Sequence, residues 1–107
     1  MEEAEDLDHA AEWRMRKVDT DPSDTVSSGA AVLLTRLAEE VRRLQGSEVF
    51  REYTAICHWL SESGEVVDFM DMANDYRAQI GVDRFPQDGA AYLRALIDLA
   101  KQTFGAT

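Results

Sequence analysis

The sequence predicts an all-α protein, a small bundle of four amphipathic helices, with the N-terminal segment forming either a fifth helix or a flexible tail. Apolar residues recur at spacings of three and four over most of the 107 residues, which is the period of a helix buried on one face. Serine, glycine and proline stand where such stretches begin and end. No stretch alternates apolar and polar residues as a half-buried strand does. A chain of this length supports one hydrophobic core.

Residues 1–27 form an acidic N-terminal segment, and residues 28–107 are predicted to form the bundle domain. A weak helix over 3–17 is indicated by one stripe of apolar side chains: Leu7, Ala11, Met15 and Val18. The alternative for this segment is a flexible tail. A loop rich in turn-forming residues follows over 19–24.

Two helices joined by a very short connection are predicted next. The first begins at Ser27 or Ser28, either of which can act as its N-cap, and it ends at Gly46. Its inward stripe is Ala30, Leu33, Leu34, Leu37, Val41 and Leu44. The second helix is capped by Ser47 and ends at Gly64. Its inward stripe is Val49, Phe50, Tyr53, Ile56, Cys57 and Leu60. Because the connection is so short, we expect the two helices to pack as antiparallel neighbours.

The last two helices of the bundle are predicted from Glu65 to Ile80 and from Pro86 to about Phe104. Gly81 stands at the usual place after a helix end, and proline suits the first turn of a helix. The inward stripe of the first is Val66, Phe69, Met70, Ala73, Tyr76 and Ile80. The inward stripe of the second is Leu93, Leu96, Ile97, Ala100 and Phe104.

Composition narrows the class of function. The net charge of −10 argues against direct binding to nucleic acid or to anionic membranes, because both are negatively charged themselves. A single cysteine, Cys57, excludes an internal disulfide and a zinc site built from several cysteines. The N-terminus is acidic, unlike that of a signal peptide, and no apolar run has the length of a membrane span. We therefore expect a cytoplasmic protein.

The sequence offers few candidates for catalysis. Asp68, Asp71 and Asp75 share one ridge of a predicted helix, which is either a solvated face or, less well supported, a ridge that holds Mg²⁺ or Ca²⁺. Cys57 and His58 are neighbours on a helix, so their side chains diverge and cannot act as a dyad. No phosphate loop, di-iron pair or hydrolase elbow occurs. The sequence therefore favours a protein that is not an enzyme and has no metal or cofactor.

Apolar side chains beyond the needs of a simple bundle are the stronger signal. They are Trp13 in the N-terminal segment, Trp59, and three residues of the last helix, Tyr92, Leu96 and Leu99. These side chains either pack against the N-terminal helix or form a surface for a partner or a second copy of the chain. Tryptophan and tyrosine suit both roles, because they bury a large area at a low entropic cost.

The leading hypothesis is a non-catalytic helical protein that acts through protein–protein contacts, as a regulator, an inhibitor, an accessory subunit or a homodimer. The first alternative is an acidic mimic of nucleic acid that blocks a basic protein with Asp68, Asp71, Asp75 and the acidic residues of the N-terminal segment. The second is a metal-dependent enzyme that uses the same aspartates. A ligand buried among the predicted core residues also stays open, because bundles hold ligands without a motif: Phe50, Phe69, Met70 and Met72.

Overall fold

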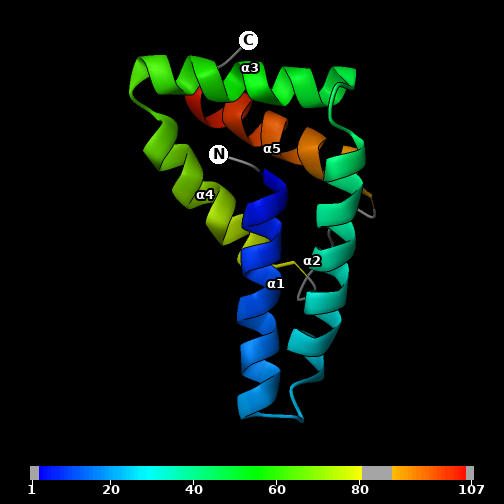
Figure 1. Cartoon of the computed structure of the whole chain (residues 1–107). Coiled ribbons are helices and arrows are strands. Elements are labelled where there is room, and N and C mark those ends of the chain that lie inside the picture. The colour runs from blue at the N-terminus through cyan, green and yellow to red at the C-terminus, as the bar shows by residue number, and fades with distance from the viewer. Residues whose placement is uncertain (1–2, 81–87, 106–107) are drawn as a thin grey trace.

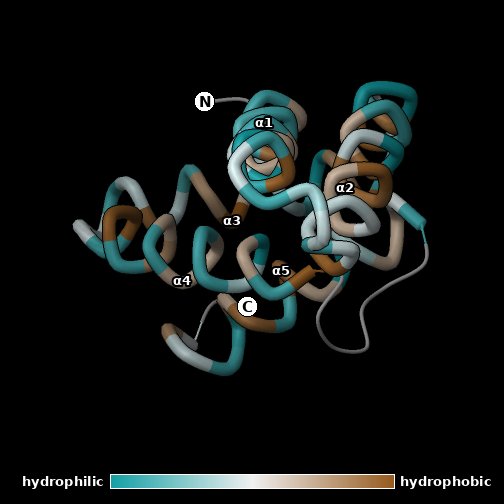
Figure 2. The backbone as a smooth tube through the Cα atoms, turned by 90° about the horizontal axis from the view of Figure 1, so that it is seen from below, coloured by the Kyte–Doolittle hydropathy of each residue, from teal (hydrophilic) through white to brown (hydrophobic). Residues whose placement is uncertain are grey.

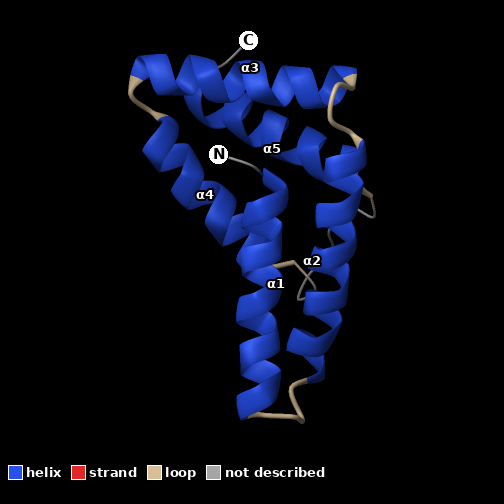
Figure 3. Ribbon diagram, in the orientation of Figure 1, coloured by secondary structure: helices blue, strands red, loops and turns tan. Residues whose placement is uncertain are grey.

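The computed structural model describes residues 3–80 and 88–105, and helices make up nearly all of this part of the chain (Figures 1 and 3). The helices are α1 (Glu3–Thr20), α2 (Thr25–Arg43), α3 (Glu48–Ser63), α4 (Val66–Ala78) and α5 (Gly89–Phe104). The described residues contain no strand, and the all-α prediction is confirmed. The N-terminal segment supplies the fifth helix, α1.

Helices α1 and α2 form a long antiparallel hairpin whose closed end projects away from the other three helices (Figure 1). The buried residues of α1 follow a spacing of four and three: Glu3, Ala4, Leu7, Ala11 and Arg14. Leu7 and Ala11 are inside as predicted, but Met15 is half-exposed and its neighbour Arg14 is buried instead. The predicted stripe was therefore wrong at its C-terminal end, where a charged residue turns inward.

The other three helices pack at the open end of this hairpin. Helix α3 crosses the end, α5 packs beneath it, and α4 descends toward the N-terminal half of α1 (Figure 1). Seen from below, the α1–α2 pair lies on one side of the molecule and α4 and α5 on the other (Figure 2). The prediction that α2 and α3 pack as antiparallel neighbours was wrong. A short connection allows a sharp change of direction, and here α2 is paired along its length with α1 instead.

Helix ends follow capping chemistry, with one correction. The N-cap of α2 is Asp24, whose carboxylate accepts hydrogen bonds from the Ser27 backbone N–H at 3.0 Å and from the Ser27 hydroxyl at 2.7 Å. Ser27 and Ser28 lie inside the helix, so the predicted cap was three or four residues late. The predictions that Ser47 caps the start of α3 and that the helix closes at Gly64 are confirmed, and Gly64 adopts a left-handed conformation as the C-cap.

Helix α4 begins and ends slightly inside its predicted bounds, and α5 begins three residues late and ends at Phe104 as predicted. Helix α4 runs from Val66 to Ala78, and α5 begins at Gly89 with Asp88 as its N-cap. Gly81 and Pro86, which were predicted to mark the ends of these helices, lie outside the described residues.

One core joins all five helices. Its largest fully buried apolar side chains come from every helix of the chain: Leu7, Leu34, Leu37, Leu60, Phe69, Leu93, Leu96 and Ile97. Helix α5 approaches α2 so closely that a Cβ added at Gly89 would lie 2.8 Å from Glu40 Cβ. Glycine is therefore required at the first turn of α5, because the backbone of α2 leaves no room for a side chain.

Candidate functional site

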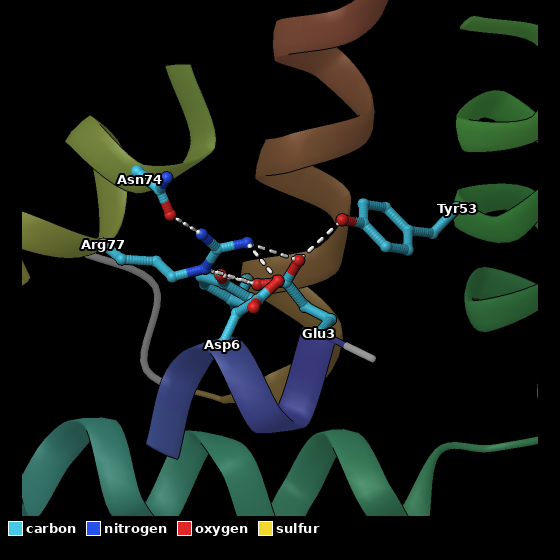
Figure 4. A network of polar contacts seen from close by, with 6 residues as sticks. Glu3, Asp6, Tyr53, Asn74 and Arg77 are labelled. Carbon is cyan, nitrogen blue, oxygen red and sulfur yellow. Dashed lines mark hydrogen bonds and ion pairs between the residues drawn. The ribbon is translucent and has the colours of Figure 1, made fainter. Parts of the chain in front are cut away.

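A buried polar network ties the N-terminal turn of α1 to α3, α4 and α5. The carboxylate of Glu3 accepts hydrogen bonds from Arg77 Nε and Nη2, both at 2.7 Å, and from the Tyr53 hydroxyl at 2.6 Å (Figure 4). The Tyr92 hydroxyl also donates to Glu3. Asn74 Oδ1 accepts a hydrogen bond from Arg77 Nη1 at 2.7 Å. Four helices thus meet at one carboxylate.

Burial makes this network energetically important. Glu3 is 5% exposed and Arg77 is 4% exposed, so each charge depends on the other for compensation. Burial by itself disfavours the charge on Arg77, but the hydrogen bonds and charge of Glu3 more than offset it and raise the arginine pKa. Burial, together with the charge of Glu3, raises the pKa of the Tyr53 and Tyr92 phenols. Both phenols therefore remain protonated donors to the carboxylate.

Sequence reasoning missed this network, although a signal for it existed. Glu3 precedes Leu7 by four residues, and Arg77 follows Ala73 by four, so each charged residue continues an apolar stripe. A charged residue at a stripe position lies either at the end of the buried face or in a buried pair. Only the packing of α1 against α4 selects the second outcome for Glu3 and Arg77.

An inner cavity of about 290 Å³ lies beside the network, between α1, α3 and α4. Its polar end holds Glu3, Asp6 and Arg77. Its apolar wall consists of Cys57, Val66, Phe69, Met70 and Ala73. Burial raises the pKa of the Asp6 carboxyl, against the opposing effect of the Arg77 guanidinium. The Cys57 thiol borders the same space, and burial raises its pKa as well.

A second hollow, the Trp13 groove, lies on the outer side of α1 against α4 and has a volume of about 390 Å³. The indole of Trp13 is 44% exposed, and Lys17 Nζ lies 4.1 Å from its ring centroid. The Arg14 guanidinium lies 5.1 Å from the same ring. These cation–π contacts fix the orientation of an exposed tryptophan. The groove is also lined by Asp6, His9, Ala10, Arg16, Asn74, Arg77 and Ala78.

Arg14 also joins three helices beneath the Trp13 groove. Its guanidinium donates hydrogen bonds to the Ser27 hydroxyl of α2, at 3.3 Å, and to the Ala78 carbonyl at the end of α4. Ser27 in turn donates to Asp24, the cap of α2. The wall of the groove is therefore held by contacts from both flanking helices.

The structure separates the residues that the sequence grouped as a partner surface. Tyr92 and Leu96 are fully buried in the core and are not available to a partner, which corrects their assignment. The reason is that α5 packs against α3 and α2, and the Tyr92 hydroxyl donates a hydrogen bond to Glu3 of α1. Leu99 is partly buried against the same core. Trp13 and Trp59, at 44% and 42% exposure, remain at the surface, on different helices.

The structure also shows where the predicted acidic ridge and the neighbours Cys57 and His58 lie. Asp68, Asp71 and Asp75 are all exposed on α4. Within residues 3–80 and 88–105, no three histidine, cysteine or acidic side chains are grouped as metal ligands would be. Cys57 borders the inner cavity, while His58 is exposed and pairs with Glu62 at 3.1 Å. In the described ranges no helix combines the length and the apolar character needed to cross a membrane.

The comparisons with known proteins give no relatives. No protein-family description, curated protein or solved structure matches this chain.

Proposed function

We propose that this chain is a non-catalytic interaction protein that binds an acidic segment of a partner protein in the Trp13 groove. The supporting observation is the half-exposed indole of Trp13, held by Lys17 and Arg14 beside a hollow of about 390 Å³. Tryptophan and arginine are the side chains most enriched among the residues that dominate binding energy. The proposal keeps the cytoplasmic location expected from the sequence.

The distribution of exposed apolar side chains supports a site on the hairpin. Six large apolar side chains are exposed in the described residues, and four of them belong to α1 and α2: Trp13, Met15, Val26 and Val32. The projecting end of the hairpin is not covered by α3 or α5 (Figure 1). The burial of Tyr92 and Leu96 removes the competing surface on α5. We therefore assign the partner site to the first helix, whereas most of the residues predicted from the sequence are on the last helix.

Local charge supports an acidic partner. The chain has a net charge of −10, yet the Trp13 groove is lined by Arg14, Arg16 and Arg77 against one carboxylate, Asp6. Lys17 lies beside the groove. A basic patch on an acidic protein attracts a partner segment that carries carboxylates. An apolar side chain of such a segment would contact the indole, and its carboxylates would face the arginines.

A matched pair of substitutions tests the proposal. Quantitative affinity enrichment is compared for the unaltered chain, Trp13→Ala and Trp59→Ala, since both indoles are exposed to a similar extent. We expect Trp13→Ala to weaken the enriched interaction by about tenfold or more while Trp59→Ala leaves it unchanged. Arg16→Glu should weaken it further through charge. Equal retention by Trp13→Ala and the unaltered chain contradicts the proposal.

The acidic mimic is the second candidate, and it is favoured by the exposure of Asp68, Asp71 and Asp75 on one ridge of α4. A mimic would bind a basic protein with affinity that falls steeply with salt, because exposed charges are screened. It would lose affinity on Asp71→Asn and keep it on Trp13→Ala. The two candidates therefore predict opposite changes in affinity for Trp13→Ala and Asp71→Asn.

A further inference from the structure

The inner cavity contains one carboxylate that the buried network leaves incompletely paired. Glu3 is saturated, because it accepts hydrogen bonds from Arg77, Tyr53 and Tyr92. Asp6 is different. Its side chain is 23% exposed, and the contact that the described residues give it is a long one, 3.4 Å from Arg77 Nη2. A half-buried carboxylate with a single weak partner retains the capacity to accept strong hydrogen bonds.

Charge around the cavity selects the sign of a ligand. Two carboxylates, Glu3 and Asp6, face one guanidinium, that of Arg77, so the polar end has an excess of one negative charge. The Arg77 nitrogens are already engaged by Glu3, Asp6 and Asn74. His58 at the cavity edge pairs with Glu62. Among the described residues that line the cavity, an anion would find no unengaged cation, and both carboxylates would repel it.

The remaining wall accepts an apolar group. Val66, Phe69 and Met70 line it from α4, and Cys57 lines it from α3. A volume of about 290 Å³ is near the lower end for small-molecule sites and accommodates a molecule of about ten non-hydrogen atoms. The cavity therefore combines an apolar body site with an anionic end.

We propose that the inner cavity binds a small organic cation, with the ammonium group on Asp6 and the apolar body against Val66, Phe69 and Met70. This site goes beyond the proposed protein interaction. Asp6 and Arg77 line both hollows, but Trp13 lines only the groove and Phe69 and Met70 line only the inner cavity. The two proposals are therefore distinguished by which of these side chains the bound molecule contacts.

Three probes of similar shape test the sign of the ligand: 2-phenylethylamine, 2-phenylethanol and phenylacetate. Binding to the full chain is followed by two-dimensional NMR titration and by the rate at which iodoacetamide alkylates Cys57, which borders the cavity. We expect the amine to bind saturably with a Kd of about 0.1–1 mM, typical of a ligand this small, and to slow alkylation. The alcohol and the carboxylate should bind at least about tenfold more weakly.

A matched pair of carboxylate variants tests the position. Asp6→Asn should weaken binding of the amine by about tenfold or more. Asp71→Asn also removes one negative charge, but from the exposed face of α4, whose other face lines the cavity, so it should not change binding. Met70→Trp fills the cavity and should abolish binding without removing a charge. It also serves as the deciding variant if circular dichroism shows that Asp6→Asn is unfolded.

Specific outcomes overturn the proposal. These are the lack of saturable binding of 2-phenylethylamine below about 10 mM, equal or tighter binding of phenylacetate, and equal loss of affinity in the Asp6 and Asp71 variants. Shifts that cluster around Trp13 instead of Phe69 and Met70 would also overturn it, because they would place the amine in the outer groove.

Discussion

Replacing Glu3 with glutamine tests whether the buried network holds α1 on the bundle. The substitution keeps the size of the side chain but removes the charge that compensates Arg77, which is 4% exposed. It also places an amide N–H₂ group among donors from Arg77, Tyr53 and Tyr92. Removing one partner of a buried ion pair typically costs about 3–5 kcal/mol, because the other charge stays buried without compensation. We expect a loss of this size in the free energy of unfolding.

The assay is urea unfolding followed by circular dichroism at 222 nm. With a denaturant dependence of about 1.5 kcal/mol per molar urea, the expected loss lowers the midpoint by about 2–3 M. Glu52→Gln is the matched control, since Glu52 accepts hydrogen bonds from Arg94 at 2.7 Å and from Lys101 at 3.1 Å near the surface. Solvent screens that network, so its variant should shift the midpoint only slightly.

A double-mutant cycle with Arg77→Met completes the test. In Glu3→Gln the Arg77 charge keeps only the long contact to Asp6 at 3.4 Å, and in Arg77→Met the Glu3 charge loses its cation, whereas the double variant removes both charges. The double variant should therefore cost less than the sum of the two, with a coupling of at least about 2 kcal/mol. Equal midpoints for Glu3→Gln and Glu52→Gln, or strict additivity in the cycle, would refute the argument that the network is buried and paired.

Two further predictions concern pH and backbone packing. Burial raises the pKa of Tyr53 and Tyr92 above the unfolded value near 10. Their contribution to the free energy of unfolding is therefore intact below pH 10 and is lost as the pH rises above it. Two phenols that ionise only on unfolding lower the free energy of unfolding by about 2.7 kcal/mol for each pH unit above 10. Urea midpoints that stay constant from pH 9 to 11 would contradict this expectation. In the second, Gly89→Ala should destabilise by about 1–3 kcal/mol, because its Cβ would lie 2.8 Å from Glu40 Cβ. Gly29→Ala, with no neighbour within 4 Å of its Cβ, should stabilise α2 by about 0.5–1 kcal/mol. If Gly89→Ala and Gly29→Ala shift the thermal unfolding temperature in the same direction, the described packing of α5 on α2 is contradicted.

Local signals in the sequence were sufficient to predict the helices and most of their inward faces. Apolar spacing identified α2 to α5, because a helix repeats its buried face every three to four residues. Ser47 and Gly64 marked the ends of α3, since a cap depends on the hydrogen bonds and dihedral angles of neighbouring residues. The cap of α2 was displaced to Asp24 because several polar residues in that loop could satisfy the same backbone groups.

The candidate sites were less predictable, because periodicity shows which face of a helix is apolar and leaves open what covers it. Trp13 and Trp59 were singled out and are exposed, while Tyr92 and Leu96 were singled out and are buried. In the sequence all four are large apolar side chains beyond the needs of a simple bundle. The difference lies in the distant segments that cover each side chain: α5 packs against α3 and α2, and the Tyr92 hydroxyl donates a hydrogen bond to Glu3 of α1.

The sequence by itself determined the helical class, the extent of most helices and the residues of the apolar core. The tertiary structure decided that Glu3 and Arg77, 74 residues apart, form a buried pair, that α3 crosses the end of the hairpin, and that the inner cavity lies beside Asp6. The physical reason is range. Helices and caps arise from contacts within a few residues, whereas a buried charge is tolerated only when a distant segment supplies its partner.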